Sequence, residues 1–425
     1  MNYPKQQIKN GVCLHTIKTN KFKTNLFSIM LTTPITKENV TKNALVSLIL
    51  RRGTQKLKSQ DEISKELENM YGADFDCGID KMGDNHVLKF YLESLNDEYL
   101  PKENNFQNSI NLLLDIVFNP LTENNKFKTE YFYSEKEKLK QIIEGKKDNK
   151  GLYAFNRCIE EMYKQKPFGL YKFGNIEDLE EITNEELYKY YKELIQKCKI
   201  DIFVSGDILD NSNEIILNNE NIQKLNDRQP QYINKFIGAD VSVCPQENII
   251  EEKLDITQGK LVIGMNVGMN NSYNENIQNI ALIYNAILGG TANSKLFQNV
   301  REKASLAYTA GSNYVRQKNS IFIRAGIEIE NYKKALEIIR KQIEDMKQGD
   351  FTEEEVENAK QYIVSTIQGI PDEQDTEITY YFGQELGETN NSIEEYIANI
   401  NSVTREQVIE LAKTISINTI YFLRN

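Results

Sequence analysis

The chain repeats itself once, and this repeat constrains its fold more than any other feature of the 425-residue sequence. Residues 123–143 resemble residues 347–367, and residues 175–207 resemble residues 392–425 in pattern and in order. The two copies are roughly 220–235 residues apart, well beyond the 20–50 residues of a solenoid repeat. A repeat of this length holds a whole domain, so we predict two homologous domains of about 200 residues each.

Stretches of alternating apolar residues are interleaved with amphipathic helices in both copies. Alternation of this kind indicates strands with one buried face, which is typical of antiparallel or mixed sheets. It occurs at residues 27–31, 88–92, 259–269 and 321–329, with helical spacing at 40–51 and 277–288. We therefore predict an α+β fold in which each domain is a mostly antiparallel mixed sheet covered by helices. The expected domains are residues 1–209 and 261–425, joined by a polar, Asn-rich segment over 210–260.

Histidine is nearly absent from the sequence. The two that occur, His15 and His86, are too far apart to belong to one local motif. The zinc motif HExxH and its inverted form HxxEH are therefore both excluded. Each histidine lies on a predicted strand, and we interpret both as structural.

Charge and cysteine content narrow the class of protein further. The net charge of −11 argues against nucleic-acid binding and against an anionic membrane surface, and no stretch approaches 18 apolar residues. The five cysteines are odd in number, and no two form a CxxC pair. This pattern favours a reduced, cytoplasmic protein without a disulfide framework or zinc ribbon.

The second copy contains a Gly-Gly turn at residues 289–290 followed by a dense motif over residues 294–308. Its pattern is S-x-L-F-x-x-x-R-E-x-x-x-L-A-Y, carried by Ser294, Leu296, Phe297, Arg301, Glu302, Leu306, Ala307 and Tyr308. It resembles the C-terminal domain of the pitrilysin/insulinase family of zinc peptidases, the inverzincins. The repeat and the length also match the half-molecule of that family, so the resemblance implies half of a metallopeptidase clamshell. The chain most resembles the inactive bacterial members associated with elongation factor P modification.

The zinc motif of that family, H-x-x-E-H followed by Gly-Thr, corresponds here to residues 43–54. Matching the Gly-Thr pair places Ala44 and Leu48 at the two histidine positions and Ser47 at the general base. The third ligand position corresponds to Gln141 or its neighbour Lys140. None of these side chains is a zinc ligand, so we expect no metal or cofactor in this chain.

Arg301 and Tyr308 match a pair that clamps substrate in the family. Both side chains are hydrogen-bond donors that can hold a peptide carbonyl and stabilise an oxyanion. Without the resemblance, Arg301 is interpreted as a surface residue paired with Glu302, and Tyr308 as a half-buried strand residue.

The leading hypothesis is a non-catalytic subunit of a heteromeric zinc peptidase. It would bind peptide substrate and complete the active chamber of a homologous partner that carries zinc. An alternative is a peptide-binding or scaffold protein with this fold and no proteolytic role, which would form a self-dimer. A third hypothesis, an active metallopeptidase in its own right, would require the ligand assignment to be wrong.

Overall fold

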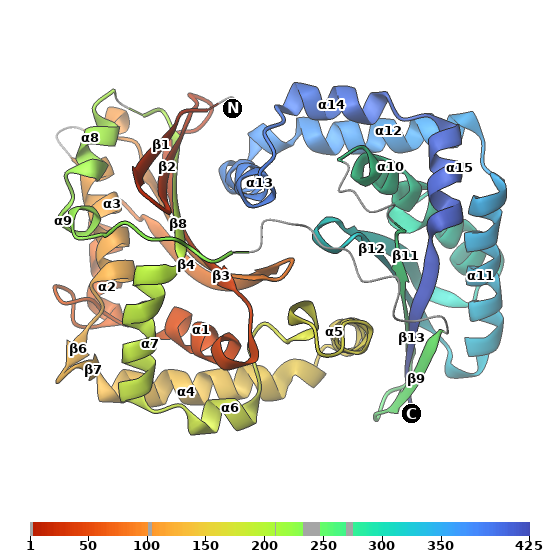
Figure 1. The fold of residues 1–425 in the computed structure, drawn as a ribbon, viewed down its shortest axis with the longest axis horizontal. Helices are drawn as coiled ribbons and strands as arrows, with labels where there is room; N and C mark the ends of the chain where they lie inside the picture. Colours follow the sequence, from red (N-terminus) through yellow and green to blue (C-terminus); the bar gives the residue numbers. More distant parts are fainter. Residues whose placement is uncertain (1–2, 101–103, 209, 233–246, 269–274) are drawn as a thin grey trace. The chain divides into compact units, whose positions relative to one another are not determined.

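The structure, a computed structural model of the full chain, describes residues 3–100, 104–208, 210–232, 247–268 and 275–425. The chain forms two compact units, coloured along the sequence in Figure 1. Unit 1 comprises Met1–Gly145, Leu170–Asn234 and Ile370–Asn390; unit 2 comprises Lys146–Gly169, Lys235–Gly369 and Asn391–Asn425. Within the described residues, no helix is long and apolar enough to cross a membrane.

Unit 1 is built on a six-stranded mixed sheet. Its strand order is β1-β2-β8-β3-β5-β4, in which β2 and β8 run parallel and the other neighbours run antiparallel. The strands are β1 (Lys5–Lys9), β2 (Val12–Lys18), β3 (Thr24–Pro34), β4 (Asp74–Met82), β5 (Asn85–Leu95) and β8 (Lys199–Gly206). The central strands are buried on both faces because helices cover the sheet, whereas β4 forms an open edge.

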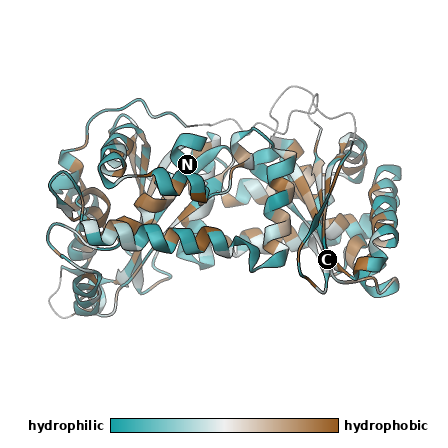
Figure 2. Cartoon of the chain, turned by 90° about the horizontal axis from the view of Figure 1, so that it is seen from below, coloured by the Kyte–Doolittle hydropathy of each residue, from teal (hydrophilic) through white to brown (hydrophobic). Residues whose placement is uncertain are grey.

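Helices pack on both faces of this sheet and bury its apolar residues. They are α1 (Lys37–Leu50), α2 (Gln60–Asn69), α3 (Asn105–Phe118), α4 (Thr129–Glu144), α6 (Ile176–Glu181), α7 (Asn184–Lys197), α8 (Ser212–Leu217), α9 (Glu220–Gln223) and α13 (Gln374–Gly387). A two-stranded ribbon, β6 (Thr122–Glu123) and β7 (Lys126–Phe127), precedes α4. Figure 2 shows apolar and polar residues interspersed along the helices, as amphipathic helices require.

Unit 2 repeats this plan with five strands in the order β11-β12-β10-β13-β9. The strands are β9 (Asn248–Lys253), β10 (Gly259–Asn266), β11 (Ala307–Val315), β12 (Ser320–Ile327) and β13 (Ser416–Arg424). The helices are α5 (Lys150–Met162), α10 (Glu275–Asn285), α11 (Tyr332–Gln348), α12 (Glu353–Gln368), α14 (Ile393–Asn401) and α15 (Arg405–Thr414). Two π-helical turns, Ala286–Gly290 and Phe297–Lys303, lie between α10 and β11.

Each unit contains one helix from the other half of the sequence. Helix α5 packs on β10 and β13 of unit 2, and α13 packs on β8 of unit 1. Close approach of α5 depends on Gly264, where an added Cβ would lie 2.6 Å from Sδ of Met162. The units therefore differ from the expected boundaries at residues 209 and 261. Residues 212–217 and 220–223 of the expected linker also form helices of unit 1, because their apolar side chains join its core.

The α+β class and the two homologous domains are confirmed. The four predicted strands correspond to β3, β5, β10 and β12, although β10 ends at Asn266 and Met269 lies outside the described residues. The helix starts at Thr183, Thr352 and Thr404 all form capping boxes, in which each hydroxyl accepts from the backbone N–H three residues later. Of the five cysteines, Cys244 lies outside the described residues.

Candidate functional site

Helix α1 carries the positions of the first two zinc ligands in the family. It begins after Thr36, whose backbone N–H donates to Oδ1 of Asn39 at 2.9 Å. The helix packs against β4, β5 and α4 and is buried along most of its length. The helix that would carry the ligands is therefore present and well packed, and only its side chains decide what it can hold.

Those side chains do not fit a zinc ion. Ala44 and Ser47 are buried, and Oγ of Ser47 donates to the carbonyl oxygen of Ala44 at 2.8 Å. Leu48 packs against the apolar core of unit 1. A methyl group, an already bonded hydroxyl and an isobutyl group cannot replace imidazole and carboxylate ligands.

Cys77 of β4 lies beside these residues, and its thiol donates to the carbonyl oxygen of Ser47 at 3.5 Å. Burial raises the pKa of this thiol to about 11, so the sulfur is protonated at neutral pH. A protonated thiol is a weak ligand, because metals bind the thiolate.

Helix α4 presents Lys138 and Ile142 to the same region, whereas Gln141 is exposed and does not line it. The alternative third-ligand position, Lys140, has its ammonium 3.6 Å from a carboxylate oxygen of Glu180. Lys138 and Arg51 of the α1 C-cap place positive charge beside the degenerate ligand positions.

A cavity of about 920 Å³ opens next to α1 within unit 1. Its walls are formed by α1, α4, the edge strand β4, its neighbour β5 and the start of α13. Seven carboxylates and four cationic side chains line it, so its surface is acidic overall. The acidic residues are Asp74, Asp76, Asp80, Glu93, Asp372, Glu373 and Asp375.

Three of these carboxylates alternate along one face of β4. Asp74, Asp76 and Asp80 are two or four residues apart and therefore share a face of the strand. Burial favours the neutral form of Asp80, but Lys89 at 2.8 Å and Lys172 at 3.1 Å hold its pKa below the usual value. None of the three was among the predicted site residues, although their alternation is visible in the sequence and could have indicated them.

Arg301 and Tyr308 both lie at the surface of unit 2. Arg301 sits in the second π-helical turn, with Nε 3.6 Å from a carboxylate oxygen of Glu302 and the guanidinium 4.5 Å from the ring centroid of Phe297. The Arg301 side chain is 43% exposed. Arg301 therefore forms the ion pair with Glu302 that its interpretation as a surface residue predicts. This pair leaves much of the guanidinium open to solvent.

Tyr308 is 65% exposed rather than half-buried. It is the extra residue of a bulge, because Ala307 pairs with Ile327 and Thr309 pairs with the adjacent Gly326. Bulges change the direction of a side chain relative to a regular strand. The local backbone thus points the Tyr308 hydroxyl away from the sheet core.

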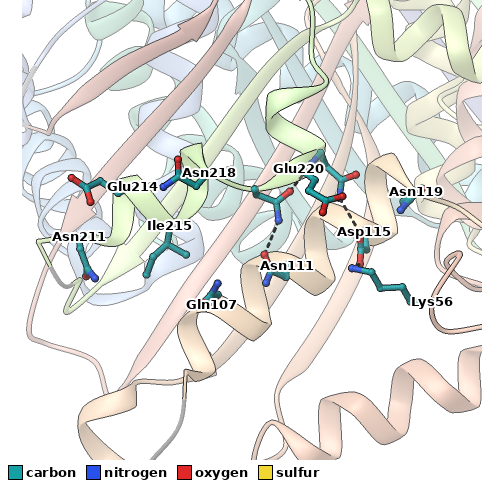
Figure 3. A pocket seen from close by; sticks show the side chains of 12 residues that line it. Lys56, Gln107, Asn111, Asp115, Asn119, Asn211, Glu214, Ile215, Asn218 and Glu220 are labelled. Carbon is teal, nitrogen blue, oxygen red and sulfur yellow. Dashed lines mark hydrogen bonds and ion pairs between the residues drawn. The ribbon is translucent and has the colours of Figure 1, made fainter.

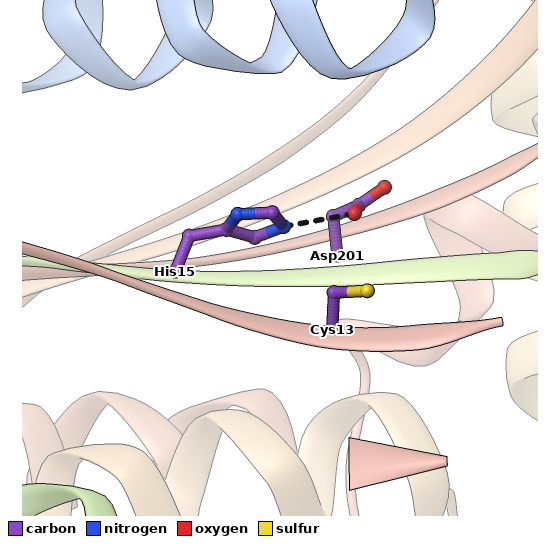
Figure 4. Close-up of side chains that lie close together, drawn as sticks. All are labelled: Cys13, His15 and Asp201. Carbon is purple, nitrogen blue, oxygen red and sulfur yellow. Dashed lines mark hydrogen bonds and ion pairs between the residues drawn. The ribbon is translucent and has the colours of Figure 1, made fainter. Parts of the chain in front are cut away.

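A second cluster lies buried in unit 1, where Cys13, His15 and Asp201 meet (Figure 4). Within the described residues this is the one group of three potential metal ligands, with ligand atoms within 4.8 Å of one another. However, Nε2 of His15 is bonded to Asp201 at 2.9 Å, and the Lys199 ammonium lies 2.5 Å from the other carboxylate oxygen. Burial opposes ionisation of Asp201, yet Lys199 and His15 lower its pKa to about 2. The cluster is therefore balanced in charge without a metal.

This network continues into helix α13. Glu385 lies 3.9 Å from the Lys199 ammonium and 2.6 Å from that of Lys5, and Tyr3 donates to it at 3.4 Å. The sequence could not reveal it, since the parallel pairing of β2 with β8 and the docking of α13 are both long-range contacts. His15 and His86 are both buried, and burial lowers the pKa of His86 to about 3.

A second cavity, of about 420 Å³, lies between α3 and helices α8 and α9 (Figure 3). Its lining is mostly carboxamide. Asn219 donates to Asn111 at 2.6 Å, and Asn221 donates to Asp115 at 2.9 Å. These bonds fasten α8 and α9 to α3, which gives the polar lining a structural role.

Comparisons with known proteins agree with this picture. Residues 181–363 match the family model described as Peptidase M16 inactive domain. The chain is 35% identical over 415 residues to a probable inactive metalloprotease of Bacillus subtilis strain 168, YmfF, covering 97% of this chain and 96% of that protein. It is 22% identical over 314 residues to an uncharacterized zinc protease of the same organism, YmxG, covering 72% and 71% of the two chains.

Solved structures show the same fold. A conserved protein from Enterococcus faecalis V583 superposes with a TM-score of 0.91 at 28% identity, covering 100% of this chain and 99% of that one. A peptidase M16 inactive domain from Pseudomonas fluorescens superposes with a TM-score of 0.78 at 17% identity, covering 100% and 98%. Together with side chains that do not fit zinc, these similarities show that the chain belongs to the M16 peptidase family as an inactive homologue.

Proposed function

We propose that this chain is a non-catalytic subunit of a heteromeric zinc peptidase. It binds peptide and completes the active chamber of a homologous partner, which carries the zinc. A contrast within the chain supports the proposal: the side chains of Ala44, Ser47 and Leu48 do not fit a metal, whereas those of Arg301 and Tyr308 are exposed to solvent. The pair of relatives in Bacillus subtilis, one named inactive and one named a zinc protease, is the kind of pair that this proposal requires.

The edge strand β4 supports peptide binding. It pairs with β5 on one side and ends the sheet on the other. An extended peptide can add to such an edge as a further strand, with backbone hydrogen bonds supplying affinity. The adjoining cavity of about 920 Å³ provides room for side chains, and its excess of carboxylates favours a peptide with Lys or Arg residues.

The role of Arg301 and Tyr308 follows from their chemistry. A guanidinium and a phenol hydroxyl donate to a peptide carbonyl and to the oxyanion that forms when water attacks it. This chain supplies the donors, and the zinc in the partner supplies the activated water. We also place the chain in the cytoplasm, in keeping with the free thiols of Cys13, Cys77, Cys158 and Cys198.

A binding or scaffold protein without a proteolytic role is the second candidate. The local contacts of Arg301 with Glu302 and Phe297 favour it, because they give this side chain a structural use. In that case the chain forms a self-dimer or a complex in which no peptide bond is cut.

Reconstitution of a complex with a zinc-bearing chain distinguishes the peptidase subunit from the scaffold protein. The full chain is mixed with a purified homologous chain that carries HxxEH, and kcat/KM is measured on a peptide library. We expect Arg301→Ala and Tyr308→Phe each to lower kcat/KM by about 10²–10³, as the loss of an oxyanion donor does.

Arg340→Ala and Tyr362→Phe are matched controls, because Arg340 is a partly exposed arginine of unit 2 and Tyr362 is a tyrosine that is 53% exposed. These variants should leave the rate unchanged. The clamp role would be refuted if the two chains co-elute but the Arg301 and Tyr308 variants leave kcat/KM unchanged. A stable self-dimer that neither binds nor activates the zinc chain would support the scaffold role.

A further inference from the structure

Unit 2 contains a cavity of about 400 Å³ on the sheet face that α5 covers, beside the edge strand β11. Its charge differs from that of the acidic cavity of about 920 Å³ in unit 1. Its lining includes two cationic side chains, Lys260 and Arg324, and no carboxylate. The remainder is formed by glycines, small apolar residues and the hydroxyl residues Thr309 and Ser312.

Lys260 and Arg324 lie on the same face of adjacent strands. Lys260 pairs with Gly326, and Arg324 pairs with Val262, so the two cations are diagonal neighbours. Diagonal neighbours have Cα atoms about 7–8 Å apart, within reach of one another for long side chains. Two like charges so placed repel each other, and an anion between them would remove the repulsion.

Neither cation forms an ion pair within the described part of the chain. Lys260 donates to the neutral amide of Gln258, and burial lowers the pKa of its ammonium. The guanidinium of Arg324 stacks on Phe155 of α5, 5.1 Å from the ring centroid. Stacking fixes the plane of the guanidinium and leaves its N–H groups available at the rim.

The N-terminus of α5 faces the same cavity, since Gly151 lines it. The N-cap Asn149 accepts from Leu152 at 2.9 Å, while the N–H groups of the first helical residues have no acceptor within the helix. These groups carry partial positive charge.

We propose that this cavity binds an oxyanion, a carboxylate or a phosphate group, between Lys260, Arg324 and the start of α5. The carboxylate would be the C-terminus of a peptide and the phosphate a group on a small ligand. Both present several acceptor oxygens to converging donors. The site belongs to unit 2 alone and requires no partner, so it goes beyond the function proposed above and can be tested on the isolated chain.

Isothermal titration calorimetry on the full chain tests it with three probes. They are inorganic phosphate, N-acetyl-trialanine with a free carboxylate, and the C-terminal amide of the same peptide. We expect binding of phosphate, of the free peptide acid or of both, and none of the amide. Binding of phosphate alone identifies a phosphate ligand, and binding of the acid alone identifies a peptide C-terminus.

The double variant Lys260→Gln, Arg324→Gln should weaken binding by at least about 100-fold, since each lost hydrogen bond to a charged group costs roughly tenfold. The control Lys333→Gln, Lys334→Gln removes the same charge from exposed positions of α11 and should bind as the native chain does. Arg324→Gln alone changes an exposed side chain and keeps the test valid if the double variant misfolds. Failure of the native chain to bind either anion, or equal binding by native chain and variants, overturns the proposal.

Discussion

Replacing Asp201 with asparagine tests how strongly the buried network beneath α13 stabilises unit 1. The change keeps the shape of the side chain and removes its charge. In the native chain the ammonium of Lys199 lies 2.5–2.7 Å from the two carboxylate oxygens of Asp201. In the variant this ammonium stays buried next to a neutral amide. Glu385 compensates only partly, because its nearest oxygen is 3.9 Å away.

The expected loss can be worked out in two ways. A carboxyl whose pKa falls from 3.8 to about 2 on folding contributes about 2–3 kcal/mol at neutral pH. Measured losses on removing one partner of a buried ion pair are about 3–5 kcal/mol. We therefore expect Asp201→Asn to lower the free energy of unfolding of unit 1 by about 3 kcal/mol at pH 7.

The pH dependence of the free energy of unfolding is an independent test of the same ion pair. Because the pKa of Asp201 is depressed in the folded state, the unfolded chain binds more protons between pH 4 and pH 2. The stabilisation is present above about pH 4 and disappears as the pH falls toward 2. The difference between native chain and variant should shrink over the same range.

Urea unfolding followed by circular dichroism measures the effect, with the midpoint of the unit 1 transition compared between proteins. Asp210→Asn is the control, since Asp210 forms an exposed ion pair with Lys18 at 3.3 Å and such pairs contribute little. A variant that unfolds within about 0.5 kcal/mol of the native chain would refute the reasoning, because surface substitutions have effects of that size.

Two further predictions concern a glycine and a thiol. Gly174→Ala should destabilise unit 1 by at least about 2 kcal/mol, since an added Cβ would lie 1.9 Å from Oγ1 of Thr41. Gly72→Ala, at nearly the same backbone angle but in open space, should cost only about 1 kcal/mol in the same urea assay; equal losses would contradict the steric argument. Burial raises the pKa of the Cys158 thiol to about 12, so it should resist alkylation at pH 8 until the chain unfolds, as mass spectrometry would show. Equal labelling of folded and unfolded chains would contradict this.

Local patterns predicted much of the fold. The alternation in residues 321–329 and the helical spacing in residues 40–51 follow from contacts between near neighbours, and the structure has β12 and α1 at these places. The motif around Arg301 was recognisable for the same reason, since all its residues lie within one short stretch. The expected boundary near residue 209 did not include the packing of α5 on the sheet of unit 2 or of α13 on the sheet of unit 1. The pattern of an amphipathic helix shows that one face is buried, but not which sheet buries it.

The sequence by itself determined that the positions matching the family's two zinc-binding histidines and its general base carry Ala44, Leu48 and Ser47. No folding pattern supplies imidazole or carboxylate groups at Ala44, Ser47 and Leu48, because ligand chemistry resides in the side chain. Only the tertiary structure decided which charged groups meet. Lys199, Asp201 and Glu385 form one buried network, and Lys260 and Arg324 share one cavity, through strand pairing and helix docking. Such contacts depend on the register of residues far apart in the sequence, which local patterns do not contain.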